Sequence, residues 1–155
     1  NAEDLAFCEA DSFDLVLGVF LFNYQDVAAT RRSMAEVRRV LRPDGRFVFA
    51  VPHPSLPWTR AHEAPFFFDA GGHSYLEAAG TTFEGSIWRR DGLEVAVRCV
   101  HKTWTDLFGA LRSAGFSSLP EVVELGVTEE HLALDPEFFG PLRGQPLHVA
   151  VGIQP

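Results

Sequence analysis

The side chains best suited to acid–base chemistry in this sequence are six histidines, which are spread along the chain. His53 follows an apolar run, Arg46 to Val51, and an imidazole at the end of a buried strand can take up a proton near neutral pH. His53 is therefore the first candidate for a general base, and His62 and His73 are second choices. The other histidines fall on expected strand or helix positions and are interpreted as structural: His101, His131 and His148.

Aromatic residues gather in a stretch rich in proline and glycine, from residue 53 to about residue 83. A long irregular stretch inside a compact domain is typical of a lid or a binding loop. Its aromatic side chains could cover an apolar substrate and exclude water, or could pack the lid onto the sheet. These residues are Trp58, Phe66, Phe67, Phe68 and Tyr75.

The composition argues against several other classes of chemistry. The two cysteines, Cys8 and Cys99, are far apart and have no metal-ligand spacing, so neither a zinc site nor a disulfide framework is expected. The net charge of −8 disfavours nucleic acid and membrane surfaces as partners. No apolar run approaches the roughly 20 residues of a membrane helix, and no signal peptide is visible. We expect a cytoplasmic protein.

The elements that would position these side chains begin with a strand–helix–strand unit. The run from Phe13 to Phe20 predicts a buried parallel strand, covered by helices on both faces and with a neighbouring strand on each side. A helix from Gln25 or Asp26 to Leu41 follows, ended by Pro43 and Gly45. Residues 46–51 predict a second parallel strand, joined to the first by a right-handed crossover.

The second half of the chain predicts a hairpin and further alternating elements. Residues 85–90 and 93–102 flank Asp91-Gly92, a signal for a two-residue hairpin turn. A helix is expected from about Thr103 to Gly115 and a strand at 121–125. Asp135-Pro136 predicts the start of a short helix, and residues 147–153 predict the closing strand. We expect one α/β domain, 1–155, with a lid insertion at about 53–102.

Three segments, in their order and spacing, resemble the C-terminal half of class I S-adenosylmethionine-dependent methyltransferases, and above all the type 11 group. These are residues 1–7, 14–26 and 37–54. They match that family's Asp-Ala-x-x-Leu-Pro-Phe segment after its third strand, its Phe-Asp-x-Val strand and its Leu-x-Pro-Gly-Gly helix end. The resemblance implies part of a Rossmann-like doubly wound sheet, mostly parallel with an antiparallel last strand, plus a β-hairpin and lid.

The resemblance also implies cofactor-binding residues, since ligands of such sheets bind at the carboxyl ends of the strands. Asn1 stands where the family has an acidic residue that binds the adenine amino group, and an amide oxygen can accept that bond too. Ala2 and Glu3 would lie along the adenine ring. Gly18 and Val19 would place carbonyl groups near the methionine ammonium, and Phe20 would pack against the cofactor. Asn23 stands where the family often has histidine. Core packing is the alternative reading for Ala2, Val19 and Phe20.

The family's glycine-rich loop and the acidic residue that ends its second strand are absent from these 155 residues. We interpret the chain as a truncated methyltransferase that acts on a small-molecule acceptor, and this fragment alone is expected to be inactive. Trp58, Phe67 and Tyr75 are the candidate substrate and lid residues, and no metal is expected. A non-catalytic α/β domain that has lost cofactor binding is the alternative. A nucleotide-binding oxidoreductase is disfavoured by the three matching segments.

Overall fold

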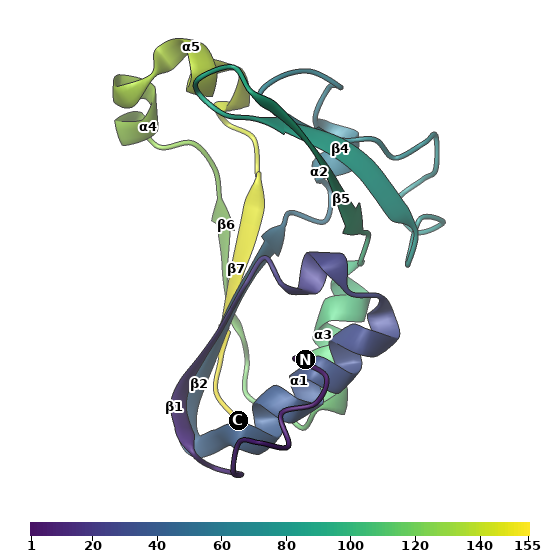
Figure 1. Cartoon of the computed structure of the whole chain (residues 1–155), viewed down its shortest axis with the longest axis vertical. Coiled ribbons are helices and arrows are strands. Elements are labelled where there is room, and N and C mark those ends of the chain that lie inside the picture. The colour runs from purple at the N-terminus through teal and green to yellow at the C-terminus, as the bar shows by residue number, and fades with distance from the viewer.

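The computed structural model describes all 155 residues, which form two sheets and a set of short and long helices (Figure 1). The larger sheet has the order β1-β2-β7-β6. Its strands are β1 (Phe13–Val19), β2 (Leu41–Pro52), β6 (Glu121–Leu125) and β7 (His148–Ile153). β2 is parallel to β1, whereas β7 is antiparallel to both β2 and β6. Three strands therefore run in one direction and the last strand opposes them, as predicted for a Rossmann-like C-terminal half.

The crossover from β1 to β2 passes through helix α1 (Val27–Val40). Asp26 caps this helix, because its carboxylate accepts a hydrogen bond of 2.6 Å from the Ala29 amide. β2 begins directly at Leu41, and its register to β1 shifts between the pairs Phe13–Leu41 and Leu15–Arg46. The predicted turn around Pro43 and Gly45 is thus an irregularity inside a longer strand.

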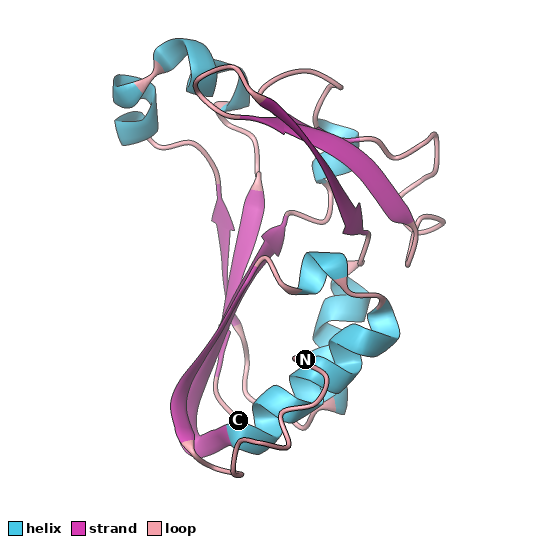
Figure 2. Ribbon diagram, viewed as in Figure 1, coloured by secondary structure: helices cyan, strands magenta, loops and turns pink.

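Helices α1 and α3 (Trp104–Ser113) lie side by side on one face of the larger sheet (Figures 1 and 2). Thr103 caps α3 through a reciprocal bond with Asp106, and the helix stops before Gly115, whose φ is 95°. The side chains between the helices and the sheet form the main core. They include Phe22, Met34, Val37, Phe47, Phe49, Leu107, Leu111, Val149 and Val151.

The other face of the larger sheet has no helix over it (Figure 2). Leu15, Leu17 and Val19 of β1 are 51%, 62% and 63% exposed, and β1 stands at the sheet edge with β2 as its one neighbour. The prediction of an interior strand covered on both faces was therefore wrong for these 155 residues. The reason is that no other segment of the chain supplies the second neighbour or the second helix layer.

The smaller sheet is antiparallel and has the order β3-β4-β5, with β3 (Phe66–Phe68), β4 (Thr82–Trp88) and β5 (Glu94–Val100). β4 and β5 confirm the predicted hairpin, but its turn is longer than two residues. The amide of Gly92 donates to the carbonyl of Arg89, and Arg89 then pairs with Leu93. Gly92 has a φ of 86°, so Arg90 to Gly92 form the three-residue loop that ends in a left-handed glycine.

The remaining helical segments are short: η1 (Phe22–Tyr24), α2 (Leu56–Thr59), α4 (Glu129–Leu134), α5 (Pro136–Phe139) and η2 (Gly140–Leu142). Asp135 caps α5 as predicted, by accepting a hydrogen bond of 3.0 Å from the Phe138 amide. No helix of the chain combines the length and apolar character needed to cross a lipid bilayer.

Candidate functional site

The carboxyl ends of β1 and β2 open toward the smaller sheet, where a doubly wound fold places its ligands. β1 ends at Val19, and the next residue, Phe20, has a φ of 50°, which puts a non-glycine residue in the left-handed region. This conformation is held by a 2.9 Å hydrogen bond from the Phe20 amide to the carbonyl of Ala50. Backbone strain of this kind is concentrated at binding and catalytic sites. Phe20 is therefore a candidate site residue at the carboxyl end of β1.

Lys102, a buried residue two positions after the end of β5, holds the residues that follow Phe20. Its ammonium group donates to the carbonyls of Phe22 at 2.8 Å and Val100 at 3.2 Å, and also to that of Gln25. Burial lowers the pKa of Lys102 to about 8. One side chain thereby joins η1 to the hairpin sheet.

Asn23 lies in η1, is 7% exposed, and makes no side-chain hydrogen bond. Its Oδ1 atom is buried without a partner. A buried amide oxygen without a partner costs about 1–3 kcal/mol, so such a group is expected to serve a ligand or a water molecule. Sequence resemblance singled out this position, and the structure adds its unpaired state.

A cavity of about 150 Å³ lies between the ends of β1 and β2 and the smaller sheet. Phe20, Asn23 and Tyr24 contribute from the β1 side, and Pro52 and His148 from the ends of β2 and β7. Phe66, Phe68, Ile87 and Val97 of the smaller sheet complete its wall. A smaller cavity of about 30 Å³ adjoins it and shares Asn23, Pro52 and Phe68.

His148 belongs to this cavity, although the sequence interpretation placed it away from the site. Its ring lies 4.9 Å from the ring of Phe20 and stacks on Phe66 at 5.7 Å. Burial lowers the pKa of His148, which keeps the imidazole neutral at pH 7. The side chain makes no hydrogen bond. A position at the start of the closing strand gives no local signal for this role, because the contacts come from β1 and β3.

His53 is buried at the end of β2, and both of its ring nitrogens are engaged. The Ser55 amide donates a hydrogen bond of 3.2 Å to Nδ1, so Nδ1 is an acceptor. Nδ1 therefore also accepts the 2.8 Å hydrogen bond from the Ser55 hydroxyl. Nε2 then donates to Glu124 Oε1 at 2.9 Å. His53 lines the smaller cavity and not the larger one. The Ser55 hydroxyl, 2.8 Å from Nδ1, is therefore a candidate relay between this nitrogen and a ligand.

The aromatic lid residues named from the sequence lie in α2, in β3 and in the loop between β3 and β4. Trp58 packs edge-on against Tyr75 and Phe83, and its indole N–H donates to the His73 carbonyl at 2.7 Å. The Tyr75 hydroxyl accepts a hydrogen bond of 3.1 Å from the Trp104 amide. Phe67 stacks on His62. None of Trp58, Phe67 and Tyr75 lines the 150 Å³ cavity, whereas Phe66 and Phe68 do.

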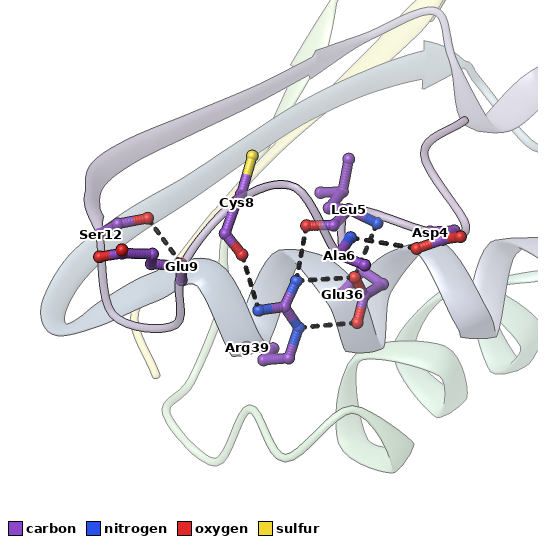
Figure 3. A network of polar contacts seen from close by, with 8 residues as sticks. All are labelled: Asp4, Leu5, Ala6, Cys8, Glu9, Ser12, Glu36 and Arg39. Carbon is purple, nitrogen blue, oxygen red and sulfur yellow. Dashed lines mark hydrogen bonds and ion pairs between the residues drawn. The ribbon is translucent and has the colours of Figure 1, made fainter.

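The first residues of the chain run along helix α1 (Figure 3). Asn1 Oδ1 accepts a 3.3 Å bond from the Glu3 amide, and the Glu3 carboxylate pairs with Arg32 of α1 at 2.6 Å. Ala2 is half-buried between them. Asn1 to Glu3 are thus ordered on α1, and none of them lines the 150 Å³ cavity.

Two side chains of α1 fix the backbone of the next residues (Figure 3). The Glu36 carboxylate accepts a hydrogen bond of 2.8 Å from the Leu5 amide. The Arg39 guanidinium donates hydrogen bonds to the carbonyls of Leu5, at 2.8 Å, and Cys8, at 3.0 Å. The same two side chains pair with each other at 2.9 Å. The Arg39 guanidinium, together with the Leu5 amide, lowers the pKa of Glu36 to about 2. Glu36 and Arg39 thus fix Leu5 and Cys8 on α1, while the Glu3–Arg32 pair holds the residues before them.

Gly18 and Val19 point to opposite faces of the larger sheet. Gly18 is buried under the ring of Phe22, whereas Val19 is exposed on the uncovered face. No group of three or more His, Cys, Asp or Glu side chains is placed to hold a metal ion.

Comparisons with known proteins connect this geometry with one family. Residues 1–49 match the family model described as a methyltransferase domain. No curated protein sequence matches the chain. Among solved structures, an S-adenosylmethionine-dependent methyltransferase from Mesorhizobium loti aligns over 100% of the chain and 67% of its own length, with 18% identity and a TM-score of 0.63.

Two further structures give the same result. A methyltransferase of this kind from Methanosarcina mazei shares 17% identity at a TM-score of 0.58, and one from Clostridium acetobutylicum shares 13% at 0.60. The chain covers 64% and 62% of their lengths, and 99% of the chain aligns in each case. Residues 1–49 therefore match the methyltransferase-domain model, and the whole chain has the fold of part of these S-adenosylmethionine-dependent methyltransferase structures.

Proposed function

We propose that this chain forms the acceptor-side part of an S-adenosylmethionine-dependent methyltransferase that acts on a small molecule. The observation that carries the proposal is the cavity at the carboxyl ends of β1 and β2, beside the strained Phe20, in a chain whose first 49 residues match the methyltransferase family. A cavity of about 150 Å³ is of a size that suits a small molecule, which supports this acceptor class.

The residues present fit one side of the cofactor. Asn1, Ala2 and Glu3 would hold the adenine ring, while Glu36 and Arg39 fix the backbone of Leu5 and Cys8 that follow them. Val19 and Phe20 are 63% and 39% exposed, so they offer apolar surface next to the end of β1, where the adenosine and methionine parts would lie. The glycine-rich loop that would hold the methionine tail, and a strand to pair with the open edge of β1, are not among these 155 residues. We propose that a longer chain supplies them.

When bound, S-adenosylmethionine supplies a methyl group on a positively charged sulfur, which is already activated for displacement. The task of this chain is then alignment and exclusion of water, and orientation of this kind lowers a barrier by about 7–11 kcal/mol. Phe66 and Phe68 would keep the acceptor dry on the hairpin side. Trp58, Phe67 and Tyr75 would keep the lid folded over it.

A proton must leave when the acceptor atom is a hydroxyl or an amine. Asn23 and His148 face the cavity without hydrogen-bond partners, so His148 can receive such a proton directly. His53 remains a candidate base through Ser55, whose hydroxyl lies 2.8 Å from Nδ1. The two candidates differ in the path of the proton: His148 would take it directly from the acceptor atom, whereas His53 would receive it through the Ser55 hydroxyl.

The test is calorimetric titration of S-adenosylmethionine into two proteins. One is the 155-residue chain, and the other carries in addition any in-frame residues encoded before Asn1. We expect heat of binding only where a glycine-rich loop is present, and Phe20→Ala should weaken binding while Phe7→Ala, at an 80% exposed residue, should not. A folded protein that includes such a loop and still ignores the cofactor would refute the proposal. Upstream sequence without that loop would favour a non-catalytic domain.

A further inference from the structure

The 150 Å³ cavity has the size of a single aromatic ring. An engineered cavity of about 150 Å³ in another protein, lined by aliphatic and aromatic side chains, stays dry and binds benzene. Here Phe20, Phe66 and Phe68 provide flat faces, and Ile87 and Val97 provide aliphatic ones. Aromatic side chains favour another ring through offset or edge-to-face contacts.

No charged side chain lines this cavity. The only titratable groups among its nine residues are Tyr24 and His148, and burial keeps His148 neutral. The whole chain carries a net charge of −8, so the surrounding field also opposes an anion. A carboxylate or phosphate placed here would lose its hydration without gaining a partner. The wall therefore selects against charged ligands.

Three polar side chains interrupt the apolar wall: Asn23, Tyr24 and His148. Tyr24 is 59% exposed, whereas Asn23 and His148 are more buried and lack side-chain hydrogen-bond partners. Asn23 has a buried, unpaired Oδ1, and a turn of its amide could present either an acceptor or a donor to the cavity. The neutral imidazole of His148 has one acceptor nitrogen. Both positions can therefore accept a hydrogen bond from a ligand that donates one.

We propose that this cavity binds one uncharged aromatic ring that carries a hydroxyl or amino group, with that group directed to Asn23 and His148. The identification of this ligand as the methyl acceptor rests on the proposed function. The binding itself needs only the cavity wall and the two unpaired side chains.

Nuclear magnetic resonance titration of the ¹⁵N-labelled 155-residue chain with phenol, toluene and benzoate tests this directly. We expect saturable shifts at Phe20, Asn23 and His148 with phenol, weaker binding of toluene, and none of benzoate. Val97→Phe should abolish binding because it fills the cavity. Val95→Phe is the matched control, since Val95 lies two residues away on the same face of β5 and does not line the cavity.

Asn23→Leu separates hydrogen bonding from packing. We expect this substitution to weaken the binding of phenol about tenfold, which corresponds to one hydrogen bond of roughly 1.4 kcal/mol. The affinity for toluene should stay unchanged. A loss of fold would instead weaken both ligands. The proposal is overturned if benzoate binds as well as phenol, if the two valine variants behave alike, or if neither phenol nor toluene gives saturable shifts. No cofactor is present in these titrations, so their result is independent of whether a longer chain binds S-adenosylmethionine.

Discussion

The ring of Phe22 occupies the space that a side chain on Gly18 would need. A Cβ built on Gly18 would stand 2.7 Å from Cε2 of Phe22 and 3.4 Å from Cβ of Phe49. Phe22 is fully buried and packs edge-on against Phe47 and Phe49. Gly18, which was predicted to approach the cofactor, thus has a packing role in this structure. It leaves room for the ring of Phe22, the residue before Asn23, in the core.

Gly18→Ala should therefore displace Phe22 and lower the free energy of unfolding by about 1–3 kcal/mol, the usual cost of overpacking a core. Denaturant unfolding monitored by tryptophan fluorescence measures this. Gly109→Ala is the control, because a Cβ on Gly109 meets nothing within 4 Å and lies inside α3. That change should be neutral or stabilising by up to about 1 kcal/mol. Equal effects of the two substitutions would contradict the packing role of Gly18.

Arg39→Met should release the first residues of the chain from α1. Arg39 donates to the carbonyls of Leu5 and Cys8, so its loss removes both contacts at once. We expect amide exchange at Leu5 and Cys8 to accelerate, because the segment opens more often without these two hydrogen bonds. Arg38→Met removes the same charge from a neighbouring position that makes no ion pair, and should leave this exchange unchanged. Unchanged exchange in the Arg39 variant would show that the segment is held by other contacts.

The pH dependence of stability should report on Glu36. Its pKa falls from 4.5 to about 2 in the folded chain, first through the Arg39 guanidinium and then through the Leu5 amide. A carboxyl group with a lowered folded pKa stabilises the protein fully above its unfolded pKa, and this contribution is lost as the pH falls through the folded value. The wild-type chain should thus exceed Glu36→Gln in stability at pH 7. The difference should shrink from about pH 4.5 downward to pH 2. A difference that stayed constant across this range would exclude the shifted carboxyl as its source.

Lys102→Met should loosen η1 from the hairpin sheet. The substitution removes the ammonium donor from the carbonyls of Phe22, Gln25 and Val100, and the Phe22 carbonyl keeps only its 3.3 Å bond from the Gln25 amide. A buried acceptor that loses its donor costs about 1–3 kcal/mol. Thermal unfolding should show a lower midpoint, and amide exchange should rise at Asn23 and Tyr24. Arg98→Met removes an exposed cation from the same strand and is expected to change neither property. If both variants unfolded alike, net charge rather than the carbonyl contacts would be responsible.

The elements predicted correctly are those whose signals are local. Asp26, Thr103 and Asp135 each cap the helix that follows them, and Gly115 ends α3 in the left-handed conformation. Such signals involve residues within one turn of each other, so the sequence contains all the information needed. The parallel strand at β1 was likewise visible as a run of apolar residues.

What the sequence did not reveal depends on contacts between distant segments. The phenylalanine triplet was interpreted as lid loop, but it forms β3 because β4 offers a strand to pair with. His148 lines the cavity beside Phe20, and its ring contacts that of Phe20, which lies more than a hundred residues earlier in the chain. The role of Lys102 and the open cavity beside Asn23 likewise arise only when η1 and β5 come together. The periodicity of apolar residues within one segment cannot predict such contacts between distant segments.

The uncovered face of the larger sheet should make this chain self-associate. Leu15, Leu17 and Val19 are exposed on β1, an edge strand with no charged residue on that face. Natural edge strands usually carry charged residues that prevent pairing with a second chain. Leu17→Lys should therefore reduce association, measured by sedimentation velocity over a range of concentrations. Leu119→Lys is the control, because Leu119 is 94% exposed in a loop away from this face and the substitution changes the net charge equally. Both variants would behave alike if general charge governed solubility. A larger effect of Leu17→Lys would assign the association to the β1 face, where the proposed function requires a further strand and helix layer.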